Sequence, residues 1–430
     1  MTVLPGGLRV CVESVPQYGR GLAAVALTVA AGGDDDPAGR HGTAHLVEHL
    51  MFPRSGREGS ADPAGAGYAA LVAGAGGVCN AETHRDHTVF HTTVPAELLP
   101  DALAWEAGRL LGFAPTEDVI RTETDVIGEE IRGAGDAGRY WESALGALYP
   151  GSRDSFGTAA ELAGITTGEV EAFFRAHYTA PRMVLSVVGD VDPARVVAVV
   201  REVFAGVVRT AEETRAAEAP RTAREPRSAE APRAATEIRT APLPAARPGV
   251  AVGHPLPDPV ADRPAYLAQA VLAQVLGRSR LPALARSARD GHRLTSATVT
   301  CGYHGQWLAS AAPDLTLAVL GRAPGTEVGA AVDIWRSVLR AVADGPLPEA
   351  EHRRAVNSLL VAWHRQADSL PTRAVALGRD ALLLPGSAGP DALPAALSRT
   401  TPAEVAAAAR ALLEGPVTVT ELAPQKGTVG

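Results

Sequence analysis

The sequence lacks the features that would place it in several specialised classes. Its 430 residues contain only three cysteines, Cys11, Cys79 and Cys301, at unpaired spacings, which argues against a disulfide framework and against a thiolate metal site. No apolar run approaches the roughly 18 residues needed to cross a bilayer, so we expect no membrane-spanning segment. The first residues also lack a basic stretch followed by a long apolar one, and we therefore expect a cytoplasmic protein.

Lysine is also scarce, since Lys426 is the only lysine among 40 basic residues. The formal net charge of -8 argues against nucleic acid as the main partner, because phosphate binding needs a basic surface, whereas basic peptides remain compatible with it. Hydrophobic residues make up 46% and charged residues 20% of the chain, which is typical of a globular protein. One hydrophobic core rarely organises a chain of this length, so we expect at least two domains.

The stretch from residue 210 to residue 249 differs from the rest of the chain. It consists largely of Ala, Arg, Glu and Pro with scarcely any large apolar residue. Such a segment cannot bury a core, and we interpret it as a linker. It divides the chain into an N-terminal domain at residues 1–209 and a C-terminal domain at residues 250–430.

The two regions beside this linker share one design. Residues 166–169 form a capping-box pattern at the start of an expected helix, and residues 401–404 repeat the pattern about 235 residues later. An apolar strand pattern follows each helix. This repetition predicts a duplicated α+β domain. Unrelated proteins built from helix–strand units would show a similar pair, so that alternative stays open.

The strongest chemical signal lies in residues 42–52, which have helix-forming residues throughout. On a helix His45 and His49 lie one turn apart on the same face, where two imidazoles can share one metal ion. Glu48 stands beside them, close enough to reach a water on that ion without being a ligand. The order His-x-x-Glu-His is the inverzincin signature. The alternative is a solvated or capping pair of histidines.

A catalytic zinc ion usually takes three protein ligands and leaves its fourth position to water, so a third ligand is expected from a second element. Glu130 is the best candidate, because residues 121–131 read as a helix with Glu123 two turns earlier on the same face. Glu129 points about 100 degrees away and should be solvated. Glu123 would then brace a ligand histidine through its other ring nitrogen. The alternative for both residues is an ordinary charged helix face.

Five blocks of residues, in order along the chain, resemble the M16 (pitrilysin-like) metallopeptidases. This family includes the mitochondrial processing peptidase, and the resemblance covers nearly all of the first half. The blocks are the strand-like residues 4–10, the motif at 45–52, residues 76–83, the helix with Glu123 and Glu130, and residues 176–192.

The resemblance implies an α+β fold of two homologous α/β-sandwich domains, each with an antiparallel-rich sheet and helices, joined by a linker. It implies one Zn²⁺ per chain on His45, His49 and Glu130, with Glu48 as general base and Glu123 as the supporting carboxylate. The implied function is a zinc endopeptidase that hydrolyses extended peptides or leader sequences.

The resemblance also suggests where a peptide would bind. The strand around Asn80 and Ala81 is similar to the edge strand on which family members hold substrate by β-augmentation, and Asn80 would contact the substrate near the scissile bond. The alternative for Asn80 is a plain residue at a strand end. The nearby His84, His87 and His91 are expected to be structural and not ligands.

The second half departs from the family pattern. Family enzymes present an Arg and, seven residues later, a Tyr that grip the substrate, but Leu294 stands where we expect the Tyr, and Arg286 is at most a shifted remnant of the Arg. In two-chain members one subunit supplies zinc and the other supplies this pair. The chain resembles the zinc subunit, similar to the β subunit of the mitochondrial processing peptidase, and we expect a second M16-like subunit or a homodimer.

Two other functions remain open. The first is a catalytically inactive structural or chaperone-like subunit of an M16-type complex. The second is a zinc hydrolase that acts on a non-peptide amide.

Overall fold

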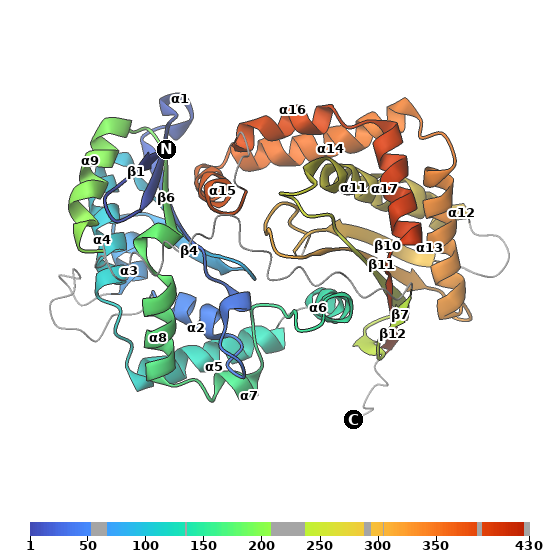
Figure 1. The fold of residues 1–430 in the computed structure, drawn as a ribbon, viewed down its shortest axis with the longest axis horizontal. Coiled ribbons are helices and arrows are strands. Elements are labelled where there is room, and N and C mark those ends of the chain that lie inside the picture. Colours follow the sequence, from blue (N-terminus) through green and yellow to red (C-terminus); the bar gives the residue numbers. More distant parts are fainter. Residues whose placement is uncertain are drawn as a thin grey trace. The chain divides into compact units, whose positions relative to one another are not determined.

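The computed structural model describes residues 1–52, 67–133, 136–207, 237–287, 294–303, 305–384 and 389–424. They form two compact units, each built on one β-sheet covered by helices (Figure 1). The first unit holds the described residues of 1–133, 154–225 and 364–390, and the second unit holds those of 134–153, 226–363 and 391–430. No helix in these ranges is long and apolar enough to cross a membrane.

The first unit contains a six-stranded sheet in the order β1-β2-β6-β3-β5-β4. All neighbouring strands are antiparallel except β2 and β6, which are parallel. The strands are β1 (Thr2–Val3), β2 (Arg9–Ser14), β3 (Leu22–Val29), β4 (Val78–Thr83), β5 (Thr88–Pro95) and β6 (Met183–Gly189).

Burial along these strands follows from their place in the sheet. Every residue of β6 is buried, as is every residue of β3 after Leu22, because helices cover both faces of the sheet centre. β4, at the edge, alternates between exposed and more buried residues. The unit's helices are α1 (Pro16–Gly19), α2 (Thr43–Leu50), α3 (Tyr68–Gly74), α4 (Leu99–Leu111), α5 (Glu117–Gly133), α7 (Ala159–Leu162), α8 (Thr167–His177), α9 (Pro193–Val203) and α15 (Leu370–Leu383).

The second unit repeats this sheet. Its order is β10-β11-β9-β12-β7, and β12 and β7 are parallel in the same way as β6 and β2. β8 also pairs with β12. Its strands are β7 (Ile238–Arg239), β8 (Leu243–Ala245), β9 (Gly249–Pro255), β10 (Leu294–Cys301), β11 (Leu315–Arg322) and β12 (Thr418–Pro424). The predicted fold class, two homologous α+β domains, is confirmed.

Both predicted capping boxes are present and begin the equivalent helices α8 and α17. Thr166 and Thr401 each accept a hydrogen bond from the backbone N–H three residues later, and the glutamate at that position accepts one from the backbone N–H of the threonine. The second unit's helices are α6 (Asp136–Leu148), α11 (Arg263–Val275), α12 (Leu281–Ser287), α13 (Val328–Ala343), α14 (Glu349–Ala367), α16 (Leu393–Ser398) and α17 (Pro402–Glu414), with a π-helical segment at Leu276–Arg280.

The two halves of the chain exchange one helix each. α6, from the first half, packs on β9, β11 and β12 of the second sheet, where Trp141 and Leu145 join a cluster with Leu315. α15, from the second half, packs on β3, β5 and β6 of the first sheet, where Ala374 contacts a small apolar cluster. Each unit is therefore completed by a helix that is distant in sequence.

The predicted linker at residues 210–249 is only partly described. Residues 210–236 lie outside the described residues, while residues 237–249 include β7 and β8, which pair with β12. The two compact units are discontinuous in sequence because of the exchanged helices, whereas the predicted domains are continuous ranges. The division at residues 1–209 and 250–430 remains a proposal.

A buried ion pair stabilises the first unit. Glu106 and Arg109, one turn apart on α4, lie 2.6 Å apart and are almost fully buried. Arg109 stacks 3.9 Å above the ring centre of Tyr68, whose hydroxyl donates to Glu106 at 2.9 Å. Because little water reaches this site, the charge of Glu106 and the charge of Arg109 each depend on the other for stabilisation.

We expect Arg109→Met to lower the free energy of unfolding by about 3–5 kcal/mol, because it leaves the Glu106 carboxylate buried without its counter-ion. Urea denaturation measures the change. Adding Glu106→Leu to this variant should recover most of the loss, because the double replacement buries no uncompensated charge. A single variant as stable as the parent would show that the pair contributes little.

Candidate metal centre

The short helix α2 carries three of the predicted site residues. Every residue of α2 except His49 is buried, because the helix packs against β4, α5 and α8. The rings of His45 and His49 meet edge to face with their centres 4.8 Å apart. This burial disfavours a solvated histidine pair and places the polar motif inside the protein.

Glu130, near the end of α5, faces both histidines. Its Oε2 lies 3.7 Å from Nε2 of His45 and 3.7 Å from Nε2 of His49. Two ligands held about 2.1 Å from a tetrahedral ion lie about 3.4 Å apart, so atoms at this spacing can share one ion. Within the described part of the chain, these three residues form a group whose ligand atoms all lie within 4.8 Å of one another. Two imidazoles and a carboxylate are a donor set that suits zinc.

Two other carboxylates of α5 point in the directions that the helical spacing predicts. Glu123 lies two turns before Glu130, and its Oε2 is 3.1 Å from Nδ1 of His49. Glu129 is exposed and pairs with Arg132 at 2.6 Å. Glu123 can therefore hold the His49 ring in one orientation, whereas Glu129 faces away from the histidines.

Burial sets the charge of the first histidine. Desolvation and, to a smaller extent, the neighbouring His49 lower the pKa of His45 to about 3. The ring of His45 is therefore neutral at neutral pH and keeps a lone pair for a metal ion.

Glu48 is buried beside the histidines and bonded to β4. The Thr83 hydroxyl donates to Glu48 Oε2 at 2.5 Å. Burial raises the pKa of Glu48 to about 7, and the hydrogen bond from Thr83 opposes that rise. A carboxyl group with a pKa in this range can take up and release a proton near neutral pH.

Thr83 was not among the residues assigned from the sequence. The alternation of a strand offered a signal, because Ala81 and Thr83 fall on the same face of β4, opposite Asn80. Recognising it required knowing that this face of β4 packs against α2.

The predicted substrate strand is an edge strand. Among the strands that the structure describes, β4 pairs with β5 on one side and has no neighbour on the other. Asn80 is exposed, while Ala81 is buried in the core that includes α2. A peptide beside β4 would therefore meet the Asn80 side chain but only the backbone of Ala81.

The histidines that follow β4 make structural contacts. His84 and His87 stack with ring centres 4.4 Å apart, and His87 bonds Asp86 at 2.9 Å. Burial lowers the pKa of His87 to about 4, with His84 contributing. His91, on β5, is paired in register with Asn80. These contacts are consistent with the expected structural role.

The region where the Arg/Tyr pair of the family was expected lies partly outside the described residues. Arg286 belongs to α12, but its side chain and residues 288–293 lie outside them. Leu294 begins β10 and is buried in the second unit's core. An aliphatic core residue thus occupies the position where a tyrosine was expected.

Comparisons with known proteins point to one family. A family model described as "Insulinase (Peptidase family M16)" matches residues 12–134, and one described as "Peptidase M16 inactive domain" matches residues 164–359. All the predicted metal and catalytic residues lie in the first match.

Curated relatives match over part of the chain. An uncharacterized zinc protease of Mycobacterium tuberculosis is 33% identical over 208 residues, covering 47% of this chain and 46% of that protein. A probable β subunit of the mitochondrial processing peptidase of Arabidopsis thaliana is 30% identical over 214 residues, covering 47% of this chain and 38% of that protein. The aligned part of the chain thus spans about half the length of the curated relatives it matches, or less.

Solved structures match over nearly the whole chain. A protease from Helicobacter pylori superimposes with a TM-score of 0.79 at 19% identity, covering 98% of both chains. A peptidase M16 inactive domain from Pseudomonas fluorescens superimposes with a TM-score of 0.76 at 17% identity, covering 99% of this chain and 97% of that one. At such low identity these two likenesses concern the fold.

Proposed function

Since the chain belongs to the M16 family of peptidases, we propose that it is a zinc-dependent endopeptidase whose metal is held by His45, His49 and Glu130. One observation carries this proposal: three ligand atoms lie within 4.8 Å of one another beside the buried carboxyl group of Glu48. The names of the curated relatives, a zinc protease and a processing peptidase, support it.

The chain's own residues divide the chemistry between them. Zinc, when bound, would polarise the scissile carbonyl group and lower the pKa of a water molecule. Glu48 accepts a proton from the attacking water and returns it to the leaving amide nitrogen as the C–N bond breaks. Thr83 keeps the Glu48 carboxyl in place, and Glu123 keeps His49 in place.

We propose that the substrate is an extended peptide, such as a leader sequence, added as a strand along β4. Backbone hydrogen bonds to an edge strand tolerate varied side chains, so extended peptides of different sequence would be accepted. Asn80 would be the nearest exposed side chain of β4, and Ala81 would contribute its backbone.

Methylating backbone nitrogens of a substrate peptide tests this mode of binding. An edge strand bonds every second residue of an added strand, so N-methylation at alternate positions should weaken binding by about 2- to 10-fold per lost hydrogen bond, or about 0.5–1.5 kcal/mol. The positions between them serve as the control, because their N–H groups point away from β4. Inhibition constants of a peptide series measure the effect, and equal losses at all positions would contradict strand addition.

We also propose that this chain works with a second M16-like subunit that supplies an Arg/Tyr pair; the alternative is a homodimer. The buried Leu294 cannot offer a hydroxyl group to stabilise the negative charge that develops on the substrate oxygen. An inactive structural subunit is disfavoured, because the match described as inactive covers residues 164–359 and not the residues of the metal centre.

Zinc content and peptide cleavage, measured together, test the proposal. The purified chain is loaded with zinc and incubated with a mixed peptide pool, alone and with a homologous chain that carries the Arg/Tyr pair. One zinc ion per chain with cleavage on mixing would support a two-subunit peptidase. Absence of zinc after reconstitution would favour the structural subunit, and cleavage confined to non-peptide amides would favour the other hydrolase.

A further inference from the structure

The two histidines of the metal centre are oriented differently. Nδ1 of His49 meets Glu123 at 3.1 Å, which fixes the ring. Nδ1 of His45 is buried and has no hydrogen-bond partner among the described residues. Something other than a hydrogen bond to the ring must therefore hold His45 in place.

The start of α2, at Thr43 two residues before His45, is held by a carboxylate from outside the helix. Asp36 Oδ2 accepts a hydrogen bond from the N–H of Gly42 at 2.7 Å, and Asp36 Oδ1 accepts one from the N–H of Ala44 at 2.7 Å. The cap position is Gly42, which has no side chain to do this. Asp36 thus satisfies two backbone donors that a helix start otherwise leaves unpaired.

Gly42 is required at this position for two reasons. Its φ of 96° lies in the left-handed region, which side chains rarely adopt. A Cβ atom there would also lie 2.7 Å from the carbonyl oxygen of Phe156. The loop at residues 154–156 therefore approaches the start of α2 as closely as the backbone allows.

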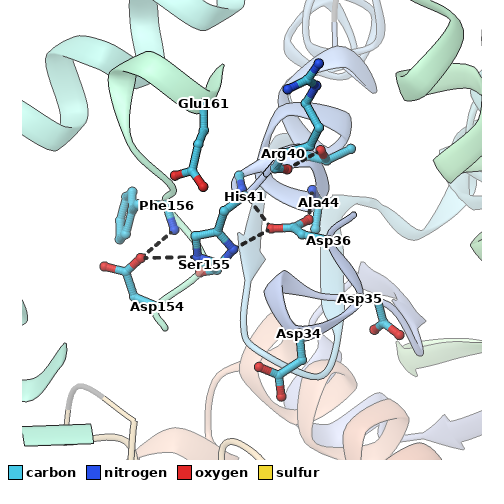
Figure 2. A network of polar contacts seen from close by, with 12 residues as sticks. Asp34, Asp35, Asp36, Arg40, His41, Ala44, Asp154, Ser155, Phe156 and Glu161 are labelled. Carbon is cyan, nitrogen blue, oxygen red and sulfur yellow. Dashed lines mark hydrogen bonds and ion pairs between the residues drawn. The ribbon is translucent and has the colours of Figure 1, made fainter. Parts of the chain in front are cut away.

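His41 links Asp36 to this loop (Figure 2). Its Nδ1 lies 3.1 Å from Asp36 Oδ2, and its Nε2 lies 4.0 Å from Asp154 Oδ1. The side chain of Asp36 is only 2% exposed and that of His41 is 10% exposed. Little water competes for the 3.1 Å contact, so Asp36 and His41 stay together, and the longer approach of His41 Nε2 brings Asp154 of the loop beside this pair.

The loop in turn touches both His45 and β4. Asp154 accepts a hydrogen bond from the N–H of Phe156 at 3.0 Å, and the Phe156 ring meets the His45 ring edge to face with centres 5.0 Å apart. Ser155 donates to the carbonyl oxygen of Thr83 at 2.8 Å. A continuous set of contacts thus runs from Asp36 through His41 and Asp154 to the ring of His45.

From these contacts we propose that Asp36, with His41 and Asp154, positions His45 and takes the place of the hydrogen-bond partner that the His45 ring lacks. Asp36 is not one of the proposed metal ligands, and it acts on His45 through the helix start and through Phe156. We call Asp36, His41 and Asp154 the clamp. This inference rests on the proposed function, because it takes His45 to be a metal ligand that the clamp positions.

The experiment compares zinc affinity among three variants of the full chain. Asp36→Ala should lower zinc affinity about 10- to 100-fold, the range typical when a residue that orients a ligand is lost. Asp36→Asn keeps an oxygen for the N–H of Ala44 and should retain part of the affinity, which keeps the test usable if the alanine variant folds poorly. Asp192→Ala is the control: Asp192 caps α9 in the same unit by accepting from the N–H of Ala194 at 2.9 Å.

Two readouts separate positioning from general destabilisation. Competition with a chelator measures zinc affinity, and the visible absorption of the Co²⁺-substituted protein reports ligand geometry. We expect both to change in the Asp36 variants and neither to change in Asp192→Ala, at a temperature where all variants are folded.

The outcomes also separate the clamp from the function it rests on. If the parent chain takes up zinc but Asp36→Ala and Asp36→Asn match Asp192→Ala in affinity and spectrum, the clamp is wrong and the metal centre stands. If the parent chain takes up no metal, the proposed function fails, and the positioning role fails with it.

Discussion

Replacing Glu48 by glutamine is expected to reduce peptide hydrolysis by about 10³-fold while leaving zinc content unchanged. Glutamine keeps the size of the side chain and can still accept from the Thr83 hydroxyl, which now donates at 2.5 Å. It cannot take a proton from the attacking water, so the loss should appear in kcat and not in KM. Steady-state kinetics with a fluorogenic peptide, and metal analysis of the same preparation, measure both quantities.

The matched control for this variant is Glu82→Gln. Glu82 lies on β4 and influences the pKa of Glu48, but its side chain is 49% exposed and bonds His84 at 3.2 Å. It should change kcat far less than Glu48→Gln does. Near-normal turnover by the Glu48 variant would remove this residue from the mechanism.

The second large effect is expected at Glu130. Removing its carboxylate by Glu130→Ala takes away a third of the protein's donor set, and zinc affinity should fall by more than the roughly 10- to 100-fold that follows loss of an outer partner. Peptide hydrolysis should disappear with the metal. Equilibrium competition with a chelator provides the measurement.

The neighbouring Glu129→Ala variant makes this test specific. Glu129 precedes Glu130 on α5 but is exposed and paired with Arg132. Its removal should leave zinc affinity and hydrolysis unchanged. If the Glu129 variant lost zinc and the Glu130 variant kept it, the third ligand would have been assigned to the wrong carboxylate.

Helical spacing predicted much of this site, because most of the site residues are close in sequence and lie on two helices. His45, Glu48 and His49 belong to one helix, and Glu123 and Glu130 are two turns apart on another, so the 3.6-residue period alone places each set on one face. That the two faces meet is a property of tertiary packing. We inferred from the family resemblance that the two faces meet, and the structure gave the distances between the side chains.

The residues that support the site were harder to predict. Asp36 is the last of three consecutive aspartates, and nothing local distinguishes it from Asp34 and Asp35 as the one that caps α2. Thr83 lies on a strand whose partner helix begins far earlier in the chain. In each case the contact depends on which segments distant in sequence are brought together.

The exchange of α6 and α15 was missed for the same reason. An amphipathic pattern shows that one face of a helix will be buried, but it does not show against which sheet. The sequence indicated the duplication, but it did not indicate that each half of the chain contributes a helix to the unit built mainly from the other half. The division at residues 1–209 and 250–430 uses continuous ranges and stays a prediction.

The exchanged helix α15 also has a consequence for synthesis on the ribosome. Val15, Ala24, Ala26, Val89 and Val188 form an apolar patch on the first sheet that packs against Ala374 of α15. Residues 370–383 are translated long after these strands, so the patch on the first sheet of the nascent chain stays exposed until α15 has been synthesised. Folding of the first unit should therefore finish only when most of the chain has left the ribosome.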